Sequence, residues 1–208
     1  MYIPPAFRVD DLADLHRTMR EARSATLVTA TKEGLIGTPM PVILEANEGA
    51  QGTLYAHVAR ANPQWNLEPS CEAMAIFTGP QAYISPSWYA TKQETHKVVP
   101  TWNYVAIHAY GPVEFFDDSD RLLDVVTRLT DLHESPRADR WRVSDAPVDF
   151  IKAQLKGIVG LRIPITRLDG KRKMSQNRPA ADRAGVIHAL SNSERDEDRR
   201  VAHLVTGE

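Results

Sequence analysis

The sequence predicts a mainly β protein of the α+β class, an antiparallel meander or barrel with helices packed outside it. Short segments rich in β-branched residues follow one another through tight turns. Strong helical periodicity is confined to a few segments, mostly in the second half of the chain. No repeat of about 20–50 residues recurs, which excludes solenoids and propellers. Antiparallel pairing fits these short connections better than a doubly wound parallel sheet does.

Composition is that of an ordinary globular protein. The 208 residues are 42% hydrophobic and 25% charged, and a chain of this length can bury a hydrophobic core without disulfides or structural metals. A net charge of −2 provides no general attraction for nucleic acid or anionic lipid. The single cysteine, Cys71, cannot form an internal disulfide, and the first residues lack a secretory signal pattern. We therefore expect a cytoplasmic protein.

The first half is expected to begin with a helix and to continue as strands. Asp10 or Asp11 can cap a helix whose apolar residues recur at helical spacing and which ends near Arg23. Strands are then expected over residues 26–31, 35–45, 52–58 and 72–78, with turns at 32–34 and 47–49 and a short helix from Pro63 to about Glu68.

The second of these strands carries Gly37, Pro39 and Pro41. Proline cannot donate a hydrogen bond to a neighbouring strand. We therefore expect this strand to be an edge strand, to contain a bulge, or to meet a ligand with its backbone.

The second half is expected to alternate strands with longer helices. Residues 99–116 read as one or two strands bent at Gly111-Pro112, and residues 158–165 as another strand, followed by a hairpin turn at 166–170. Helices are expected over 119–133, 148–155 and 179–205, the last with a break at 191–193. These segments are interpreted as one domain over residues 1–208, with helical additions at about 119–155 and 179–205.

An uncharged stretch of about 19 residues, 73–91, approaches the length of a membrane helix. Gly79-Pro80 and Ser85-Pro86 interrupt it, and its polar side chains would be left without partners in lipid. No membrane association is expected.

Four segments combine polar or basic residues with aromatic residues or proline: 57–65, 85–89, 97–104 and 173–179. A flat aromatic cofactor with a phosphate tail requires this mixture, because apolar groups cover the ring, amides and hydroxyls meet its polar edge, and cations or helix N-termini bind the phosphate. In the first segment, Arg60 and Asn62 precede the expected helix start at Pro63 and could meet such a phosphate.

Each of these residues also has a purely structural interpretation. Arg60 can be a solvated surface charge and Asn62 a helix N-cap. The large aromatic residues can pack a core, and the basic residues near Lys173 can form a solvated surface.

Other chemistries lack their patterns. The histidines are dispersed and have no cysteine or carboxylate companions at metal-ligand spacing, so no metal site is expected. The nucleotide triphosphate, Rossmann and hydrolase motifs are missing, and no nucleophile stands beside an identifiable base.

Five sequence pieces together resemble the PaiB family, described as FMN-binding negative transcriptional regulators. They run in order over nearly the whole chain: Met1-Tyr2-x-Pro-x-x-Phe7; Ala59-Arg60-Ala61-Asn62-Pro63-Gln64-Trp65; Ser85-Pro86-Ser87-Trp88-Tyr89; Val99-Pro100-Thr101-Trp102-Asn103-Tyr104 with His108 and Gly111; and Lys173-x-Ser175-Gln176-Asn177-Arg178. The resemblance implies an antiparallel split β-barrel that binds FMN, in a homodimer with its flavin sites at the interface.

It also implies site residues. Thr38 to Val42, Pro41 included, would lie along the flavin ring. His57, Arg60 and Asn62 would face the phosphate and ribityl chain. Further residues of the motifs would contact flavin, close the partner's site or pack the interface: Trp88, Lys97, Trp102, Tyr104, Lys173 and Arg178.

Three functions are compatible with this resemblance. The first is a flavin-dependent reductase, oxidase or sensor, which needs no protein nucleophile because the flavin carries the chemistry. The second is a repressor that binds DNA or another protein, although acidic residues near the C-terminus, such as Glu194 and Asp198, would repel phosphates. The third is haem binding or degradation, with His57, His96 or His108 as the axial ligand.

Overall fold

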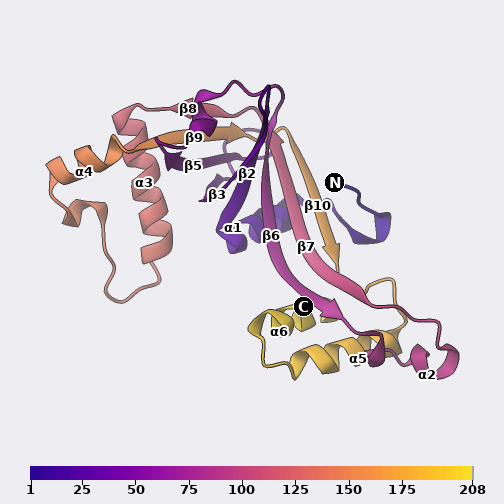
Figure 1. Ribbon diagram of the computed structural model, residues 1–208. Coiled ribbons are helices and arrows are strands. Elements are labelled where there is room, and N and C mark those ends of the chain that lie inside the picture. Colours follow the sequence, from indigo (N-terminus) through magenta and orange to yellow (C-terminus); the bar gives the residue numbers. More distant parts are fainter. Residues whose placement is uncertain (208) are drawn as a thin grey trace. The chain divides into compact units, whose positions relative to one another are not determined.

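The structure, a computed structural model, describes residues 1–207 and contains two antiparallel sheets and six α-helices (Figure 1). The strands are β1 (Arg8–Val9), β2 (Ser24–Thr31), β3 (Gly34–Pro41), β4 (Ile43–Glu45), β5 (Thr53–Ala59), β6 (Ala73–Ile84), β7 (Thr101–Gly111), β8 (Glu114–Phe116), β9 (Ile158–Pro164) and β10 (Arg167–Lys173). The helices are α1 (Leu12–Ala22), α2 (Thr91–Thr95), α3 (Ser119–Glu134), α4 (Val148–Leu155), α5 (Ala180–Ser191) and α6 (Asp196–Thr206). Four short 3-10 helices complete the structure: η1 (Pro5–Phe7), η2 (Pro63–Asn66), η3 (Pro86–Trp88) and η4 (Val143–Asp145).

Hydrogen bonding orders the strands as β1-β10-β7-β6-β2-β3 in one sheet and as β4-β5-β9-β8 in the other. The predicted antiparallel α+β class is confirmed, and neither sheet closes into a barrel within residues 1–207. The chain divides into two compact units. Within the described residues, unit 1 comprises residues 1–15, 78–107 and 169–207, and unit 2 comprises residues 16–77 and 108–168. The strands β6 and β7 contribute to both units.

Unit 2 contains the β2-β3 hairpin and the four-stranded sheet. β2 and β3 pair in register from Ser24↔Pro41 to Thr31↔Gly34, and β3 ends the strand order, so this proline-containing strand is an edge, one of the predicted outcomes. The helix α3 packs on the four-stranded sheet through a core of Ile43, Phe116, Leu122, Val125, Leu129 and Leu155. Burying each large apolar side chain contributes about 1.5–3 kcal/mol. This core fixes α3 and α4 beside β8 and β9 (Figure 1).

Unit 1 covers one face of its strands with α5 and α6. Its core consists of Ala82, Ile84, Tyr89, Val105, Met174, Val186, Leu190, Val201, Ala202 and Val205. Contact between α5 and η3 is so close that a Cβ added at Gly185 would lie 2.0 Å from the carbonyl oxygen of Trp88. A glycine is therefore required there.

Most predicted elements are confirmed. The first helix is α1, and Asp11 caps it by accepting a 2.7 Å hydrogen bond from the backbone of Asp14. The break at Gly111-Pro112 separates β7 from β8, and Asp118 caps α3. The break predicted in the C-terminal helical segment separates α5 from α6.

Four predictions of element type or length were wrong. The strand predicted over residues 35–45 is two strands, β3 and β4, that belong to different sheets and are separated at Val42. The strand predicted to end at residue 78 continues through Pro80 to Ile84; its pairs with β2 involve residues 74–76, so Pro80 lies beyond that ladder. The predicted helix at 63–68 is the shorter 3-10 helix η2.

The turn predicted at residues 166–170 is instead part of β10, where Gly170 pairs with Val9. A Cβ at Gly170 would lie 2.2 Å from a methyl group of Leu15. The glycine that suggested a turn therefore serves a close approach between a strand and a helix.

No helix within residues 1–207 has the length and apolar content needed to cross a bilayer. The same residues contain no group of three or more histidine, cysteine or acidic side chains that could hold a metal ion.

Candidate functional site

The predicted flavin-contacting residues fall into two groups of six. Unit 2 holds Thr38, Pro41, Val42, His57, Arg60 and Asn62, and unit 1 holds Trp88, Lys97, Trp102, Tyr104, Lys173 and Arg178. The two groups are described separately below.

Thr38 and Asn62 belong to one hydrogen-bonded network centred on Gln64. The Thr38 hydroxyl donates to Gln64 Oε1 at 2.6 Å, and Asn62 Nδ2 donates to Thr38 Oγ1 at 2.9 Å. Asn62 Oδ1 also accepts from the backbone N–H of Gln64 at 2.9 Å, which makes it the cap of η2. Both ends of the Asn62 side chain thus hold η2 and β3 together.

Arg60 is also held by protein groups. Its Nε donates to the carbonyl of Lys156 at 2.9 Å and its Nη2 to that of Ile158 at 3.2 Å. Its guanidinium lies 5.6 Å from the ring centroid of Trp65 and 3.5 Å from an Asp117 oxygen. These contacts fix Arg60 against the β9 end of the sheet and satisfy much of its donor capacity.

His57 is different, because its Nδ1 is buried and has no hydrogen-bond partner among residues 1–207. Burial lowers the pKa of the His57 imidazole, so the ring is neutral at pH 7. Pro41 is exposed at the end of β3, whereas Val42 is 5% exposed and belongs to the core. Among the six predicted residues of unit 2, His57 is therefore the one with an unmet hydrogen-bonding group.

In unit 1, aromatic side chains gather on strands β6 and β7. Trp102 and Tyr83 are 44% and 50% exposed and meet edge to face with centroids 6.5 Å apart. Trp102 Nε1 donates to Gln81 Oε1 at 3.0 Å. Neighbouring residues along a strand point to opposite faces, and Val105 and Ile84 face the helices. Tyr83, Trp102 and Tyr104 therefore lie on the face that α5 and α6 leave uncovered.

Three cations lie in the same part of unit 1. Lys171 Nζ lies 5.0 Å from the ring centroid of Tyr104 on the uncovered face. The guanidinium of Arg178 lies 4.5 Å from the ring centroid of Tyr89, which belongs to the core beneath α5. Lys173 Nζ donates to the hydroxyl of Thr101 and, at 2.7 Å, to the carbonyl of Trp102. Among residues 1–207, no acidic side chain forms an ion pair with Lys171, Lys173 or Arg178. We call these three residues the basic cluster.

The basic cluster contains positive charges that raise one another's electrostatic free energy. Burial, followed by the positive charges of Lys171 and Arg178, lowers the pKa of the Lys173 ammonium. Lys171 was not predicted, although its spacing of two from Lys173 on a strand places both on one face. That spacing was recognisable only once residues 167–173 are known to form a strand.

The loop after β10 positions Arg178. Ser175 adopts a left-handed conformation with φ of 60°, and its hydroxyl accepts a 3.0 Å hydrogen bond from the buried side chain of Asn103. Its carbonyl accepts from the backbone N–H of Arg178 at 2.9 Å. Gln176 Oε1 in turn accepts from the backbone of Met174 at 2.6 Å. The motif residues Asn103, Ser175 and Gln176 thus shape this loop.

The other two predicted residues of unit 1 lie outside the basic cluster's contacts. Trp88 packs against the core beneath α5, which agrees with its structural interpretation. Lys97 is exposed, and its backbone N–H donates to the Thr95 hydroxyl at 3.2 Å.

A charged hollow in unit 2, of about 490 Å³, contains Tyr55, Glu114, Arg128 and Arg162. Arg162 binds Glu48 at 2.6 Å, and Arg128 binds Glu45 at 2.7 Å. Burial would raise the pKa of Glu48, but hydrogen bonds from Arg162 and Tyr55 and the charges of Arg162 and Arg128 lower it overall. Cations and acids balance here, so the fold itself accounts for this cluster.

Comparisons with known proteins agree with the sequence motifs. The model of the family described as "Putative FMN-binding domain" matches residues 1–167. The chain is 32% identical over 206 residues to Protease synthase and sporulation protein PAI 2 of Bacillus subtilis. This alignment covers 99% of this chain and 96% of that protein. It is 32% identical over 241 residues to Uncharacterized protein AN0679 of Emericella nidulans, with the same shares covered.

Solved structures show the same fold at low identity. The Rv2991 protein of Mycobacterium tuberculosis is 12% identical with a TM-score of 0.54, over 86% of this chain and 94% of that one. The flavocytochrome Anf3 of Azotobacter vinelandii is 11% identical with a TM-score of 0.56, over 80% of this chain and 69% of that one. These likenesses confirm the split-barrel type of fold. On the family match, the chain belongs to the FMN-binding family that its motifs resemble, and FMN is its cofactor.

Proposed function

We propose that this chain is a flavin-dependent oxidoreductase in which the basic cluster of Lys171, Lys173 and Arg178 holds the FMN phosphate. The observation that carries this proposal is that three neighbouring cations in unit 1 have no acidic partner among residues 1–207. Grouping partly buried positive charges is unfavourable unless an anion compensates them. A phosphate dianion would supply that compensation and accept charge-assisted hydrogen bonds.

The surroundings of the cluster suit the rest of the cofactor. The uncovered face next to it presents the rings of Trp102, Tyr104 and Tyr83 and the amide of Gln81. Aromatic faces stack on a flat ring system, and an amide can meet its polar edge. When bound, FMN supplies reversible electron and hydride transfer, while the protein binds, orients and tunes it. The residues of unit 1 therefore fit the chemistry of FMN.

The predicted flavin contacts of unit 2 stay predictions. His57 is the strongest among them because its Nδ1 is buried and unpaired. Arg60 has an acidic neighbour, Asp117, at 3.5 Å, and Asn62 caps η2, which argues for their structural interpretation. The visible spectrum of the purified protein tests the haem alternative. A Soret band would support haem binding, and flavin absorbance would support the proposal.

A homodimer is part of the proposal. Trp102 and Tyr83 expose large apolar areas on one face, and such patches are typical of interaction surfaces. Sedimentation equilibrium of the flavin-loaded chain tests this point, with a mass of twice 23.3 kDa expected. We expect Trp102→Ala to weaken both dimerisation and flavin binding.

A regulatory role is the second candidate. It is favoured by the relative in Bacillus subtilis, which is named Protease synthase and sporulation protein PAI 2. The net charge of −2 gives no general affinity for DNA, so we expect such a role to act through the flavin or through a partner protein. Salt-dependent binding of the purified chain to duplex DNA would contradict that expectation.

The phosphate assignment is tested by comparing FMN with riboflavin, which lacks the phosphate. We expect Lys173→Met and Arg178→Met each to weaken FMN binding by about 1.5–3 kcal/mol, the usual contribution of a charge-assisted contact, and to leave riboflavin binding unchanged. Lys32→Met, in the exposed β2-β3 turn, is the matched control and should change neither. Arg60→Ala should also change neither; if it alone removes the preference for FMN, the phosphate lies near Arg60 and the proposal is wrong.

A further inference from the structure

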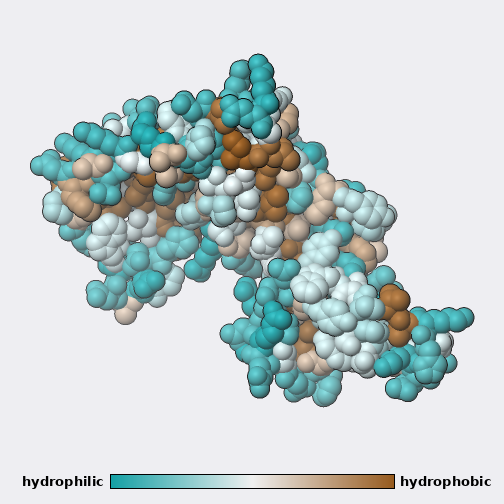
Figure 2. All heavy atoms as spheres, viewed as in Figure 1, coloured by the Kyte–Doolittle hydropathy of each residue, from teal (hydrophilic) through white to brown (hydrophobic). Residues whose placement is uncertain are grey.

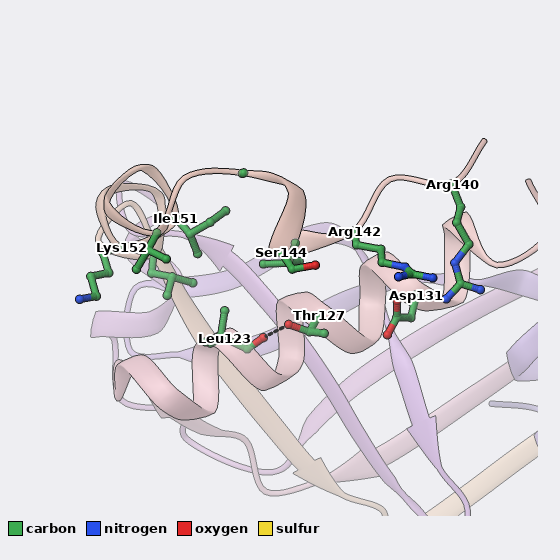
Figure 3. A pocket seen from close by; sticks show the side chains of 12 residues that line it. Leu123, Thr127, Asp131, Arg140, Arg142, Ser144, Ile151 and Lys152 are labelled. Carbon is green, nitrogen blue, oxygen red and sulfur yellow. Dashed lines mark hydrogen bonds between the residues drawn. The ribbon is translucent and has the colours of Figure 1, made fainter.

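A second hollow in unit 2 lies between α3, η4 and α4 and has a volume of about 550 Å³. This size is within the range of about 300–1,000 Å³ that is typical of small-molecule sites. Its residues come from three neighbouring elements of one unit (Figure 3). None of them belongs to the motifs that the FMN site uses.

The hollow has an apolar end. Leu123, Ile151 and Leu155 line it, together with Val148, which is 68% exposed, and Lys152 lies beside Ile151 at the same end (Figure 3). Figure 2 shows hydrophobic residues over α4 among hydrophilic neighbours, and Figure 3 shows Leu123 and Ile151 facing one another across the hollow. When a ligand removes exposed apolar surface of this kind from water, the complex is stabilised by about 25 cal/mol per Å².

The opposite end is polar and positively charged. Arg140 and Arg142 lie there with Asp131, and Ser144 lies between the two ends (Figure 3). The two guanidinium groups form no hydrogen bond or ion pair with any side chain in residues 1–207. Two positive charges against one negative charge leave a net positive end.

The loop that carries these arginines is fixed by its backbone. The N–H of Trp141 donates to Glu134 Oε2 at 3.1 Å, and that of Arg142 donates to Asp145 Oδ2 at 2.8 Å. Both bonds involve backbone atoms, so substituting the arginine side chains leaves them intact. The position of the charges is thus determined by the loop and not by pairing between side chains.

We propose that this hollow binds a small amphipathic anion, with its acidic head between Arg140 and Arg142 and its apolar body against Leu123, Ile151 and Leu155. A neutral apolar molecule would leave the arginines without a partner, and a simple inorganic anion would leave the apolar end in water. A carboxylate on a medium-length hydrocarbon chain satisfies both ends. The inference is independent of the proposed FMN chemistry.

The test uses the flavin-loaded protein and isothermal titration with octanoate. We expect binding, and we expect acetate and octanamide to bind at least about tenfold more weakly, since the first lacks the apolar body and the second lacks the charge. Arg142→Gln should weaken octanoate binding about fivefold to tenfold. Asp131→Asn should strengthen it, because it removes the negative charge at the same end.

Arg20→Gln is the matched control, because this exposed arginine lies on α1, outside the hollow and away from the loop that carries Arg140 and Arg142. It should leave octanoate binding unchanged. Thermal melting and the flavin spectrum check that each variant is folded, and both should equal those of the unmodified chain. The proposal is overturned if octanoate does not bind, if octanamide binds equally well, or if Arg142→Gln and Asp131→Asn both leave the affinity within about twofold.

Discussion

Replacing Gln64 with leucine should strongly destabilise unit 2. Gln64 is completely buried, and its Nε2 donates to Thr29 Oγ1 at 3.0 Å and to the carbonyl of Ile36 at 3.3 Å, while its Oε1 accepts from Thr38. Leucine keeps most of the apolar volume but removes all of these hydrogen bonds. The variant therefore isolates the polar contribution.

The magnitude follows from the groups left without partners. A buried polar group without a hydrogen bond costs about 1–3 kcal/mol. The two threonine hydroxyls can rotate toward other acceptors. The two backbone carbonyls that Gln64 Nε2 faces, those of Ile36 at 3.3 Å and Leu27 at 3.5 Å, lose this donor. Two unsatisfied groups correspond to a loss of about 2–6 kcal/mol in the free energy of unfolding. For a chain of this length that is a decrease in Tm of about 4–24 °C.

The assay is urea unfolding followed by circular dichroism. Gln51→Leu is the matched control, since its side chain donates one hydrogen bond, to the Thr166 carbonyl at 2.8 Å. It should cost less than about 1 kcal/mol. If Gln64→Leu is as stable as the unmodified chain within about 0.5 kcal/mol, the network does not hold β3 and η2 together, and the placement of Thr38 and Asn62 needs another explanation.

Two further predictions concern His57 and Gly111. Burial lowers the pKa of His57, so below about pH 6.5 the unfolded chain binds a proton at this residue that the folded chain does not, and stability should decline as the pH falls. Urea midpoints measured between pH 8 and pH 5 should decline less steeply for His57→Gln than for the unmodified chain. Equal slopes for the two proteins would refute this. At Gly111, a Cβ would lie 2.0 Å from the Pro164 carbonyl oxygen, so Gly111→Ala should lose about 1–3 kcal/mol. Gly37→Ala, whose nearest contact would be 3.7 Å away, should change little, and equal melting temperatures for the two variants would contradict the steric argument.

Local patterns predicted those elements whose own residues determine them. The stripe of apolar residues and the Asp118 cap suffice for α3, and β-branched residues followed by a glycine turn suffice for β2 and β3. The wrong predictions occur where a segment that is distant in the sequence determines the local structure. Gly170 looks like a turn residue until Val9 pairs with it and Leu15 packs on it. The boundary at Val42 is another example, because the chain there passes from one sheet to the other.

For the proposed FMN site, the sequence indicated the types of residue involved better than it indicated which charged residues would lack a partner. The motif around Lys173 and Arg178 indicated a polar segment, but Lys171 joins it only through the strand geometry of β10. Conversely, the polar appearance of Arg60 and Asn62 reflects bonds to backbone groups and to Thr38. A sequence shows which side chains can bind an anion, and it does not show which of them the fold already satisfies.

Charge pairing is therefore the property that separates structural clusters from candidate binding sites in this protein. Around Arg162, each cation has an acid within ion-pair distance, and the cluster needs nothing from outside. The basic cluster has no acid, and the end of the hollow formed by Arg140 and Arg142 has too few acids to balance it. A fold that merely solvated these cations would tolerate their replacement by neutral side chains with no effect on any ligand. Different ligands should respond at the two places: FMN relative to riboflavin at the basic cluster, and octanoate relative to octanamide at Arg142.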